Sequence, residues 1–363
     1  MRILAVFGTR PEAIKMAPVI GAAQECGIDV SVCVTAQHRE MLDQMLEVFQ
    51  IKPDFDLDLM QENQSPLAVA ARVFNSLSPV IASVHPDWLL VQGDTTSAFA
   101  AAFVGYQHRV RVGHIEAGLR THDKWQPFPE EINRRLVTVL ADLHFAPTQR
   151  AAMALAAEGV LAGRIHVTGN TVVDALQAIL KRPANFSDPR LRALTGRFVL
   201  LTAHRRESFG ERFEQICQAA VELLRSFPDL ILVFPVHPNP HVAEMAQRLL
   251  GGEARALLVP PLSYIEFVHL MKSAALILSD SGGVQEEAPS VGAHVLVLRD
   301  VTERPEAVEY GWAELVGTSR TRIVQRATAW LGDKTRGEAD SRENPFGDGK
   351  ASARILQALR GYR

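Results

Sequence analysis

Residues 276–290 read Leu-Ile-Leu-Ser-Asp-Ser-Gly-Gly-Val-Gln-Glu-Glu-Ala-Pro-Ser, a pattern that predicts a strand, a polar turn and a helix in succession. Gly282 and Gly283 carry no side chains, so their backbone N–H groups can approach a phosphate where the helix begins. Glu287 follows about one turn later, where its carboxylate can accept hydrogen bonds from ribose hydroxyls. The alternative interpretation is an ordinary strand–turn–helix capped by Ser281.

The same alternation of short apolar runs and amphipathic stretches continues along the whole chain. The predicted strands are Ile3–Phe7, Val30–Thr35, Trp88–Val91, Val110–Ile115, His144–Pro147, Ile165–Thr168, Phe198–Leu201, Leu230–Phe234, Ala256–Val259, Ala274–Leu278 and Val295–Leu298. Helical periodicity fills most gaps, for example Pro66–Ser83, Gly210–Arg225 and Tyr264–Met271. Alternation of this kind predicts parallel sheets with helices on both faces, and two series predict two doubly wound α/β domains.

The length of 363 residues is also typical of two domains. The boundary is expected between Thr168 and Gly196, because Lys181–Arg190 is polar and contains two prolines. The domains predicted on this basis are residues 1–168, residues 169–345 and a C-terminal helix within residues 346–363.

Composition narrows the class of protein. A formal net charge of −3 gives no reason to expect nucleic acid or a membrane surface as a partner. Three scattered cysteines favour reduced thiols in the cytoplasm over a disulfide framework. No signal-peptide pattern and no apolar run of spanning length are expected, and no metal site is predicted from the histidines and cysteines.

The first predicted strand runs into Gly-Thr-Arg-Pro-Glu at residues 8–12. Arg10 and Lys15 would flank the N-terminus of the following helix, where a cation is unfavourable unless an anion such as a diphosphate lies nearby. A capped helix with two solvated cations is the alternative. No G-x-G-x-x-G fingerprint follows any strand, so no dinucleotide cofactor is expected.

Three acidic residues are placed at strand or helix ends of the first domain. Asp94 follows one strand, Glu116 follows the next, and Glu130 falls in a first helical turn after a proline-rich loop. Each alone has an ordinary explanation as a cap or as a charge at a helix start. Together they are typical of general acid/base groups that face a cleft.

The second domain places basic residues after its first strand, at His204 and Arg205. Arg304, just before a helix, suits a sugar or phosphate contact. His237 lies in a proline-rich turn where contact with a ligand and a purely structural role are equally plausible, and an aromatic such as Phe267 is more often part of a core.

The motifs as a set resemble those of one family, the non-hydrolysing bacterial UDP-N-acetylglucosamine 2-epimerases. The matching stretches are GTRPEAIKMAP (8–18), TAQHREMLDQ (35–44), GDTT (93–96), GHIEAGLRT (113–121), PFPEEINR (127–134), TGNTVVDAL (168–176), HRRESFG (204–210), SDSGGVQEEAPS (279–290) and TERPEAV (302–308). The resemblance runs essentially end to end. It implies a GT-B architecture of two Rossmann-like domains with parallel sheets facing a central cleft, a homodimer, and a C-terminal helix that packs back on the first domain.

The resemblance also implies roles for individual residues. The catalytic group it implies is Asp94, Glu116, Glu130 and His204, and the substrate-binding group is Arg10, Lys15, Arg134, Phe267, Ser281, Gly282, Gly283, Glu287 and Arg304. Some members bind a second UDP-GlcNAc as an activator, through motifs that hold Gln37, Glu40, Arg205 and His237 here. Asn63 departs from the arginine often found near that position, and Val301 replaces a usual threonine.

The implied reaction is the interconversion of UDP-GlcNAc and UDP-ManNAc for surface polysaccharide synthesis, with no cofactor. It proceeds by elimination of UDP to 2-acetamidoglucal and re-addition from the other face, which requires fixed positive charge for the diphosphate and acid/base groups for carbon 2. Two alternatives from other classes are a UDP-sugar-dependent GT-B glycosyltransferase and a non-catalytic UDP-sugar-binding protein. Hydrolysing relatives that release free ManNAc are a further possibility, decided by water access.

Overall fold

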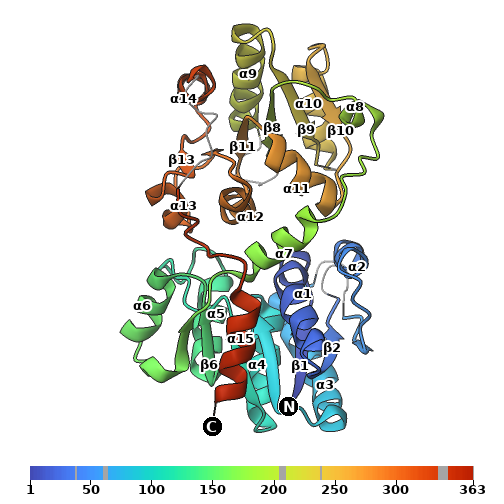
Figure 1. The fold of residues 1–363 in the computed structure, drawn as a ribbon, viewed down its shortest axis with the longest axis vertical. Helices are drawn as coiled ribbons and strands as arrows, with labels where there is room; N and C mark the ends of the chain where they lie inside the picture. The colour runs from blue at the N-terminus through green and yellow to red at the C-terminus, as the bar shows by residue number, and fades with distance from the viewer. Residues whose placement is uncertain (37–38, 60–63, 204–209, 238, 334–341, 363) are drawn as a thin grey trace. The chain divides into compact units, whose positions relative to one another are not determined.

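The computed structural model describes residues 1–36, 39–59, 64–203, 210–237, 239–333 and 342–362, without the side chains of Glu40 and His241. Within these ranges the chain divides into two compact units (Figure 1). Unit 1 combines Met1–Gln177 with Phe346–Arg363, and unit 2 is Ala178–Pro345. The sequence-based boundary after residue 168 differs from this division by the helix at 171–180, most of which belongs to unit 1.

Unit 1 is built on a seven-stranded parallel sheet of order β3-β2-β1-β4-β5-β6-β7. Its strands are β1 (Arg2–Phe7), β2 (Asp29–Val34), β3 (Phe55–Asp56), β4 (Trp88–Gln92), β5 (Arg111–Ile115), β6 (Leu143–Ala146) and β7 (Ile165–Val167). The central strands are buried on both faces, which is why they read as continuous apolar runs. Six of these strands match sequence predictions within a residue or two, and the two-residue edge strand β3 was not predicted.

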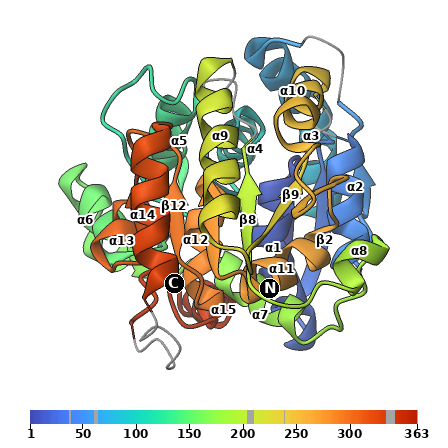
Figure 2. The same ribbon diagram turned by 90° about the horizontal axis from the view of Figure 1, so that it is seen from above.

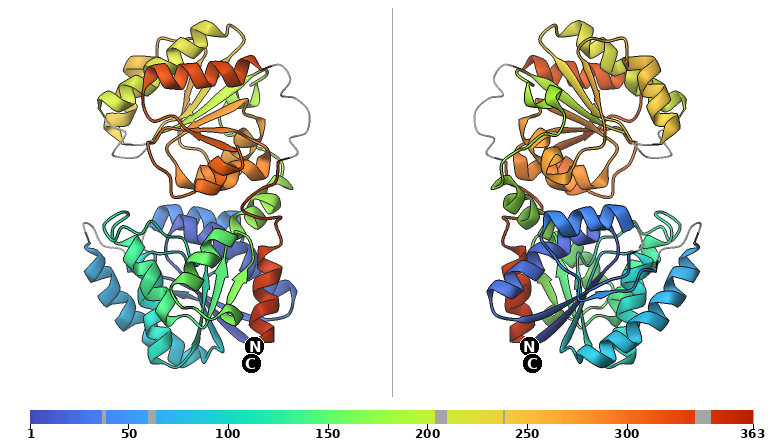
Figure 3. Two further views of the ribbon diagram at one scale, coloured as in Figure 1. Left: turned by 90° about the vertical axis from the view of Figure 1, so that its left-hand side faces the viewer. Right: turned by 90° about the vertical axis from the view of Figure 1, so that its right-hand side faces the viewer.

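Helices cover both faces of this sheet (Figure 3). The helices of unit 1 are α1 (Arg10–Glu25), α2 (Arg39–Val48), α3 (Pro66–Val84), α4 (Thr96–Gln107), α5 (Glu130–Leu140), α6 (Gln149–Ala157), the short 3₁₀ helix η1 (Ala162–Arg164), α15 (Ala351–Gly361) and, through Gln177, α7 (Thr171–Leu180). Helices α3, α4 and α5 pack side by side, and α1 packs with α15. The apolar residues of β1 and β4 and the buried faces of α3 and α4 form one core cluster.

The C-terminal helix α15 is part of unit 1. A Cβ atom added to Gly113 on β5 would lie 3.7 Å from Leu359 of α15. The ring of Tyr362 meets Trp88 edge-on at 5.3 Å, and the guanidinium of Arg111 lies over the Tyr362 ring. Since side chains alternate along a strand, His114, the residue after Gly113, faces the opposite side of the sheet.

Unit 2 repeats the architecture with six parallel strands in the order β10-β9-β8-β11-β12-β13. The strands are β8 (Phe198–Thr202), β9 (Ile231–Pro235), β10 (Ala256–Val259), β11 (Leu276–Ser279), β12 (Val295–Val297) and β13 (Ala313–Leu315). The helices are α8 (Pro189–Arg192), α9 (Glu211–Ser226), α10 (Pro240–Leu250), α11 (Tyr264–Ser273), α12 (Gly282–Glu287), the 3₁₀ helix η3 (Ala288–Val291), α13 (Pro305–Glu309) and α14 (Arg320–Gly332). Helices α9 and α14 lie side by side (Figure 2) and close a second apolar core.

One helix among the described residues, α3, is long and apolar enough to cross a membrane by length and composition, although the sequence had suggested no such run. A core helix of a soluble protein passes the same test, so this match is weak evidence for a membrane span. Seven side chains of α3, including Val73 and Leu77, are buried in the unit 1 core against the sheet and α4. That packing explains the apolar sequence of α3.

Candidate functional site

The sheet order identifies where each unit can bind a ligand. In unit 1 the order reverses between β1 and β4, and in unit 2 it reverses between β8 and β11. Ligands of open α/β sheets bind beyond the carboxyl ends of the strands at such a switch point. Among the candidate residues predicted from sequence, Arg10, Lys15, Asp94 and Glu116 follow β1, β4 and β5 in unit 1, and Ser281, Gly282 and Gly283 follow β11 in unit 2.

The turn after β1 is organised by Glu12, a buried residue whose role was not predicted from the sequence. One carboxylate oxygen of Glu12 accepts hydrogen bonds from the backbone N–H groups of Gly8 (2.9 Å) and Thr9 (2.7 Å). The other accepts a hydrogen bond from the Thr95 hydroxyl at 2.6 Å, which ties the β1 turn to the β4 turn. Burial raises the pKa of Glu12 above its ordinary value, and these hydrogen bonds oppose that rise. The spacing Thr-x-x-Glu is a capping-box pattern that could have revealed this role.

Lys15, on the first helix, forms a buried ion pair with Glu116 beyond β5. Asn170 also lies near the same carboxylate, its amide nitrogen 3.4 Å from Oε2 of Glu116. Glu116 has a φ of +64°, a conformation that is uncommon for a glutamate and that gathers at functional sites. Lys15, which was predicted to bind substrate, therefore contacts Glu116, which was predicted to be a catalytic acid.

Asp94, the second predicted acid, is held from α5. The Arg134 guanidinium forms an ion pair with the Asp94 carboxylate, and Asn133 donates a hydrogen bond to the Asp94 backbone carbonyl at 3.0 Å. Both Arg134 and Asn133 are buried, whereas Asp94 is partly exposed. Asp94 immediately precedes Thr95, so this pair and the Glu12 network belong to one continuous polar cluster in unit 1.

The third predicted acid, Glu130, begins α5 and is half-buried. Its neighbour Glu131 is fully buried and was not singled out from the sequence. The Glu131 carboxylate accepts hydrogen bonds from the backbone N–H groups of Thr121 (3.0 Å) and His122 (3.3 Å) and lies 3.5 Å from Arg134. Glu131 therefore anchors the loop that leads into α5, and Glu130 remains the more accessible of the two carboxylates.

A buried histidine on β5 contacts the backbone of the turn that carries Asp94. His114 on β5 hydrogen-bonds through Nε2 to the carbonyl of Gly93 at 2.7 Å. Burial lowers the pKa of His114 to about 3, so the ring is neutral at physiological pH. A neutral imidazole there donates one hydrogen bond to a carbonyl and adds no charge next to Asp94.

In unit 2 the turn after β11 has the form that the sequence predicted. The chain leaves β11 at Ser279, and the backbone N–H of Ser281 donates a hydrogen bond to the Ser279 hydroxyl at 3.0 Å. Helix α12 begins at Gly282 and is only six residues long, continuing into η3. A short helix has a weaker dipole, so the capacity of this turn for a phosphate depends mainly on its backbone N–H groups. Gly283 at this helix start is exposed.

Arg304 packs directly against this turn. A Cβ atom added to Gly282 would lie 3.0 Å from Nη1 of Arg304, closer than ordinary contacts allow. The Nε of Arg304 donates a hydrogen bond to buried Glu286 at 2.7 Å, and its guanidinium also contacts Glu303. Glycine at 282 thus leaves space for a guanidinium at the start of α12.

Two further predicted contacts occupy the same part of unit 2. Glu287 is buried and accepts a hydrogen bond from the Tyr264 hydroxyl at 3.1 Å. Phe267 is half-buried on α11. Arg10, in unit 1, is half-buried at the first position of α1.

Several predicted residues cannot be placed. Gln37, His204 and Arg205 lie outside the described residues, and Glu40 falls within α2 with its side chain outside the description. His237 is exposed, and its Nδ1 accepts a hydrogen bond from the backbone N–H of Asn239 at 3.2 Å. Within the described side chains, no group of three or more histidine, cysteine, aspartate or glutamate residues could hold a metal ion.

Two doubly wound parallel sheets, each with polar residues at its switch point, define a GT-B protein made of two Rossmann-like domains. The family model described as UDP-N-acetylglucosamine 2-epimerase matches residues 22–360. The chain therefore belongs to the UDP-N-acetylglucosamine 2-epimerase family.

Individual relatives agree with this assignment. A UDP-N-acetylglucosamine 2-epimerase of Yersinia pestis is 49% identical over 373 residues, covering 100% of this chain and 99% of the relative. The UDP-GlcNAc 2-epimerase of Neisseria meningitidis bound to UDP-GlcNAc has a TM-score of 0.89 at 43% identity, with 100% of both chains covered. A co-structure of MnaA with UDP from S. aureus also has a TM-score of 0.89, at 44% identity, covering 99% of this chain and 96% of that one.

Proposed function

We propose that this protein catalyses the reversible epimerisation of UDP-N-acetylglucosamine to UDP-N-acetylmannosamine by elimination of UDP to 2-acetamidoglucal and re-addition. The observation that carries the proposal is the pairing of two carboxylates with buried cations at neighbouring strand ends, Glu116 with Lys15 and Asp94 with Arg134. Relatives of similar sequence are named for this activity, and one was solved with UDP-GlcNAc bound.

The chemistry explains why several acids are needed. The proton on carbon 2 of the sugar is not adjacent to a carbonyl, so a base alone removes it only with difficulty. Departure of UDP from carbon 1 while the base takes the proton yields 2-acetamidoglucal. Return of UDP, with a proton delivered to the opposite face of carbon 2, gives the epimer. One face needs a base and the other an acid, and each such group typically contributes about 10²- to 10⁴-fold.

We assign these proton transfers to Asp94, Glu116 and Glu130, and we propose His204 as a further catalytic group. Lys15 and Arg134 contact two of the carboxylates and fix their orientation. A carboxylate with a fixed direction loses little entropy in the transition state.

We assign the nucleotide to the unit 2 turn. The N–H groups at Ser281, Gly282 and Gly283, together with Arg304, stabilise the charge that develops on the departing diphosphate. Arg304 is held in place by Glu286, so its donors are oriented before the ligand arrives. In the same proposal Glu287 accepts hydrogen bonds from ribose hydroxyls, Phe267 lies beside the base, and Arg10 adds positive charge from unit 1.

The experiment that tests the reaction incubates UDP-GlcNAc with the full chain in deuterated water and follows the sugar by NMR. Deuterium at carbon 2 of recovered UDP-GlcNAc and UDP-ManNAc, with no added cofactor, is expected. Free ManNAc as the main product would instead indicate hydrolysis, and absence of both products would overturn the proposal.

Variants separate catalysis from binding. Asp94→Asn, Glu116→Gln and Glu130→Gln are expected to lower kcat by about 10²-fold or more while UDP affinity changes little. Glu47→Gln, an exposed residue on α2, is the matched control and is expected to behave as wild type. Normal turnover in all three acid variants would refute the catalytic assignment.

We also propose that the protein is a homodimer that contacts its second copy through α5. Ile132, Leu136 and Val139 lie on this helix at spacings of four and three residues and are 37%, 40% and 83% exposed. Such a stripe of exposed apolar residues is typical of an interface. Leu136→Glu is expected to give a monomer in sedimentation velocity. Met153→Glu on α6, also an exposed apolar position, is the control.

A second UDP-GlcNAc bound near Gln37, Glu40, Arg205 and His237 would act as an activator. Sigmoidal dependence of rate on UDP-GlcNAc, lost in His237→Ala, is the expected result, and hyperbolic kinetics in the wild type would exclude activation.

We propose a cytoplasmic enzyme that supplies precursors for surface polysaccharide. Cell fractionation tests its location, and analysis of the polysaccharide in a deletion strain tests its role.

A further inference from the structure

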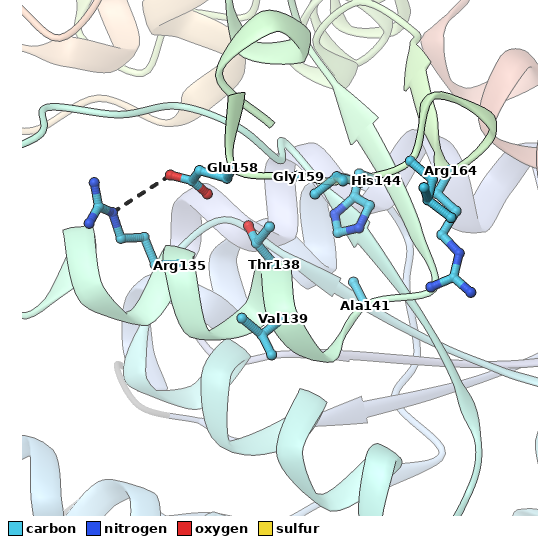
Figure 4. A pocket seen from close by; sticks show the side chains of 10 residues that line it. Arg135, Thr138, Val139, Ala141, His144, Glu158, Gly159 and Arg164 are labelled. Carbon is cyan, nitrogen blue, oxygen red and sulfur yellow. Dashed lines mark ion pairs between the residues drawn. The ribbon is translucent and has the colours of Figure 1, made fainter. Parts of the chain in front are cut away.

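A separate cavity of about 400 Å³ lies within unit 1, bordered by the C-terminal part of α5, the start of β6 and the segment from Glu158 to Arg164 (Figure 4). Its volume falls in the range of roughly 300 to 1,000 Å³ typical of small-molecule sites. None of the residues that border the cavity belongs to the polar cluster around Asp94 and Glu116, which follows the carboxyl ends of β4 and β5. The cavity is therefore not the switch-point site.

His144 is a buried histidine that borders this cavity and, like His114 on the adjacent strand, has a ring nitrogen without a partner among the described residues. It is 1% exposed, and its Nδ1 has no hydrogen-bond partner within the part of the chain that the structure describes. A buried polar atom without a partner costs free energy, so it indicates that something else satisfies it. Burial, and then the nearby Arg164 and Arg120, lower the pKa of His144 to about 4, so the ring is neutral and lies in a positive environment.

The charges around the cavity favour an anion. Arg164 borders it, is exposed and has no ion pair with the described residues. Arg135 borders it on the other side, 3.7 Å from the Glu158 carboxylate (Figure 4). The side chain of Arg120, which is 1% exposed, forms two hydrogen bonds to Glu158. Arg120 and Arg135 both contact Glu158, and Arg135 also contacts Glu131, so Arg164 is the guanidinium at this cavity whose charge is not balanced by an ion pair with the described residues.

Most of the other lining residues are apolar, with Val160 and Leu161 on one side and Val139 and Ala141 at the C-terminal end of α5, next to Thr138. We propose that this cavity binds a small organic anion, with its phosphate or carboxylate group on Arg164 and His144 and its apolar body against Val160 and Leu161. Guanidinium groups bind both oxyanions through paired donors, and the apolar walls favour an organic body over an inorganic ion.

An anion bound in this cavity would affect the polar cluster around Asp94 through a series of ion pairs along α5. Arg135 contacts Glu131 (3.4 Å) as well as Glu158, and Glu131 contacts Arg134, the partner of Asp94. An anion that competes with Glu158 for Arg135 therefore alters the charge balance at Glu131. This coupling rests on the proposed catalytic role of Asp94, whereas binding to the cavity does not.

Isothermal titration of the full chain with phenyl phosphate tests the site, in the presence of excess UDP so that nucleotide sites are filled. The expected Kd is about 1 mM or tighter, with inorganic phosphate and benzyl alcohol each at least about tenfold weaker because each lacks one half of the ligand. Benzoate in place of phenyl phosphate distinguishes a carboxylate ligand from a phosphate ester.

Arg164→Glu is expected to weaken binding of phenyl phosphate at least about tenfold. Arg248→Glu, an exposed arginine on α10 in unit 2, is the matched control and is expected to bind as wild type.

A histidine-labelled sample supplies a second measurement. The His144 resonance, assigned by its loss in His144→Asn, is expected to shift on addition of phenyl phosphate. No shift, or equal affinity in wild type and Arg164→Glu, would overturn the site. Binding seen only when the protein is diluted to a monomer would assign the cavity to a contact between copies and would also overturn it. Binding with no change in epimerase rate would retain the site and refute the coupling.

Discussion

Lys15 on α1 and Glu116 beyond β5 form a buried ion pair, although 101 residues separate them in the sequence. The pair exists because β1, β4 and β5 are adjacent in the sheet, which brings the start of α1 beside the end of β5. Removal of one member of a buried pair leaves an uncompensated charge.

Lys15→Met is therefore expected to lower kcat by about 10²-fold through misorientation of Glu116. Lys52→Met, an exposed lysine in a loop, is the control for the same substitution. The measurement is steady-state epimerisation with UDP affinity in parallel. A variant with reduced UDP affinity and unchanged kcat would show that Lys15 acts only on the nucleotide.

Glu12 predicts an unusual dependence of stability on pH. Its pKa in the folded protein is raised by burial above the ordinary value of 4.5. The folded state then binds more protons at Glu12 than the unfolded state as pH rises above 4.5, so this residue contributes a loss of stability with rising pH. Glu12→Gln imitates the protonated form and can still accept from Gly8 and Thr9 while donating to Thr95.

The free energy of unfolding of Glu12→Gln, measured in urea, is expected to decline less than that of wild type between pH 4.5 and pH 8. Glu25→Gln, an exposed residue at the end of the same helix, is the control. Identical pH profiles for wild type and Glu12→Gln would show that Glu12 is ionised with its ordinary pKa.

Local pattern predicted most of the fold. The strand predicted at Ala256–Val259 has the observed bounds of β10, and the strand predicted at Trp88–Val91 differs from β4 by one residue, because buried parallel strands are continuous apolar runs. The edge strand β3 has only two residues, and β13 reads Ala-Glu-Leu, so neither forms a continuous apolar run that a pattern would reveal. Short edge strands depend on pairing with a neighbour rather than on their own sequence.

The sequence was enough to predict which acidic residues belong to the site, but not which cations form ion pairs with them. Asp94 and Glu116 were identified because polar residues after apolar strands mark the carboxyl edge of a sheet. Their partners, Arg134 and Lys15, come from helices whose position depends on strand order, and one sequence does not specify that order. Glu12 was overlooked because a capping glutamate has the same sequence pattern whether it is exposed or buried.

The close contact between Gly282 and Arg304 predicts how substitutions at Gly282 affect nucleotide binding. A Cβ at Gly282 would press on the Arg304 guanidinium, whereas a Cβ at Gly283 would lie 3.8 Å from its nearest neighbour, the Ser281 hydroxyl. Gly282→Ala is expected to displace Arg304 and weaken UDP binding by about tenfold with little change in thermal stability. Gly283→Ala leaves Arg304 in place, so any loss of affinity in it reports on the approach of the ligand to the turn.

Calorimetric titration with UDP, extended to Arg304→Ala and the double variant, separates these effects. If alanine at 282 acts through Arg304, the two losses are strongly non-additive, because the double variant has no guanidinium left to displace. Additive losses would show that Gly282 acts on the ligand independently.

The buried histidines His114 and His144, paired in register on β5 and β6, predict sensitivity to acid. Their pKa values in the folded protein are lowered to about 3 and about 4, chiefly by burial, from an ordinary value of 6.5. Below pH 6.5 the unfolded state binds protons that the folded state does not, so stability present above that pH is lost as pH falls toward 4. The contribution of His144 to this loss is on the order of 3 kcal/mol.

His144→Asn is expected to flatten the decline in the urea midpoint between pH 6.5 and pH 4.5, where Glu12 acts in the opposite direction. His85→Asn is the control, because His85 is exposed with a φ of +48°, which asparagine tolerates. An unchanged slope in His144→Asn would mean that the pKa of His144 is the same in the folded and unfolded states, which would contradict the positive environment inferred for the unit 1 cavity.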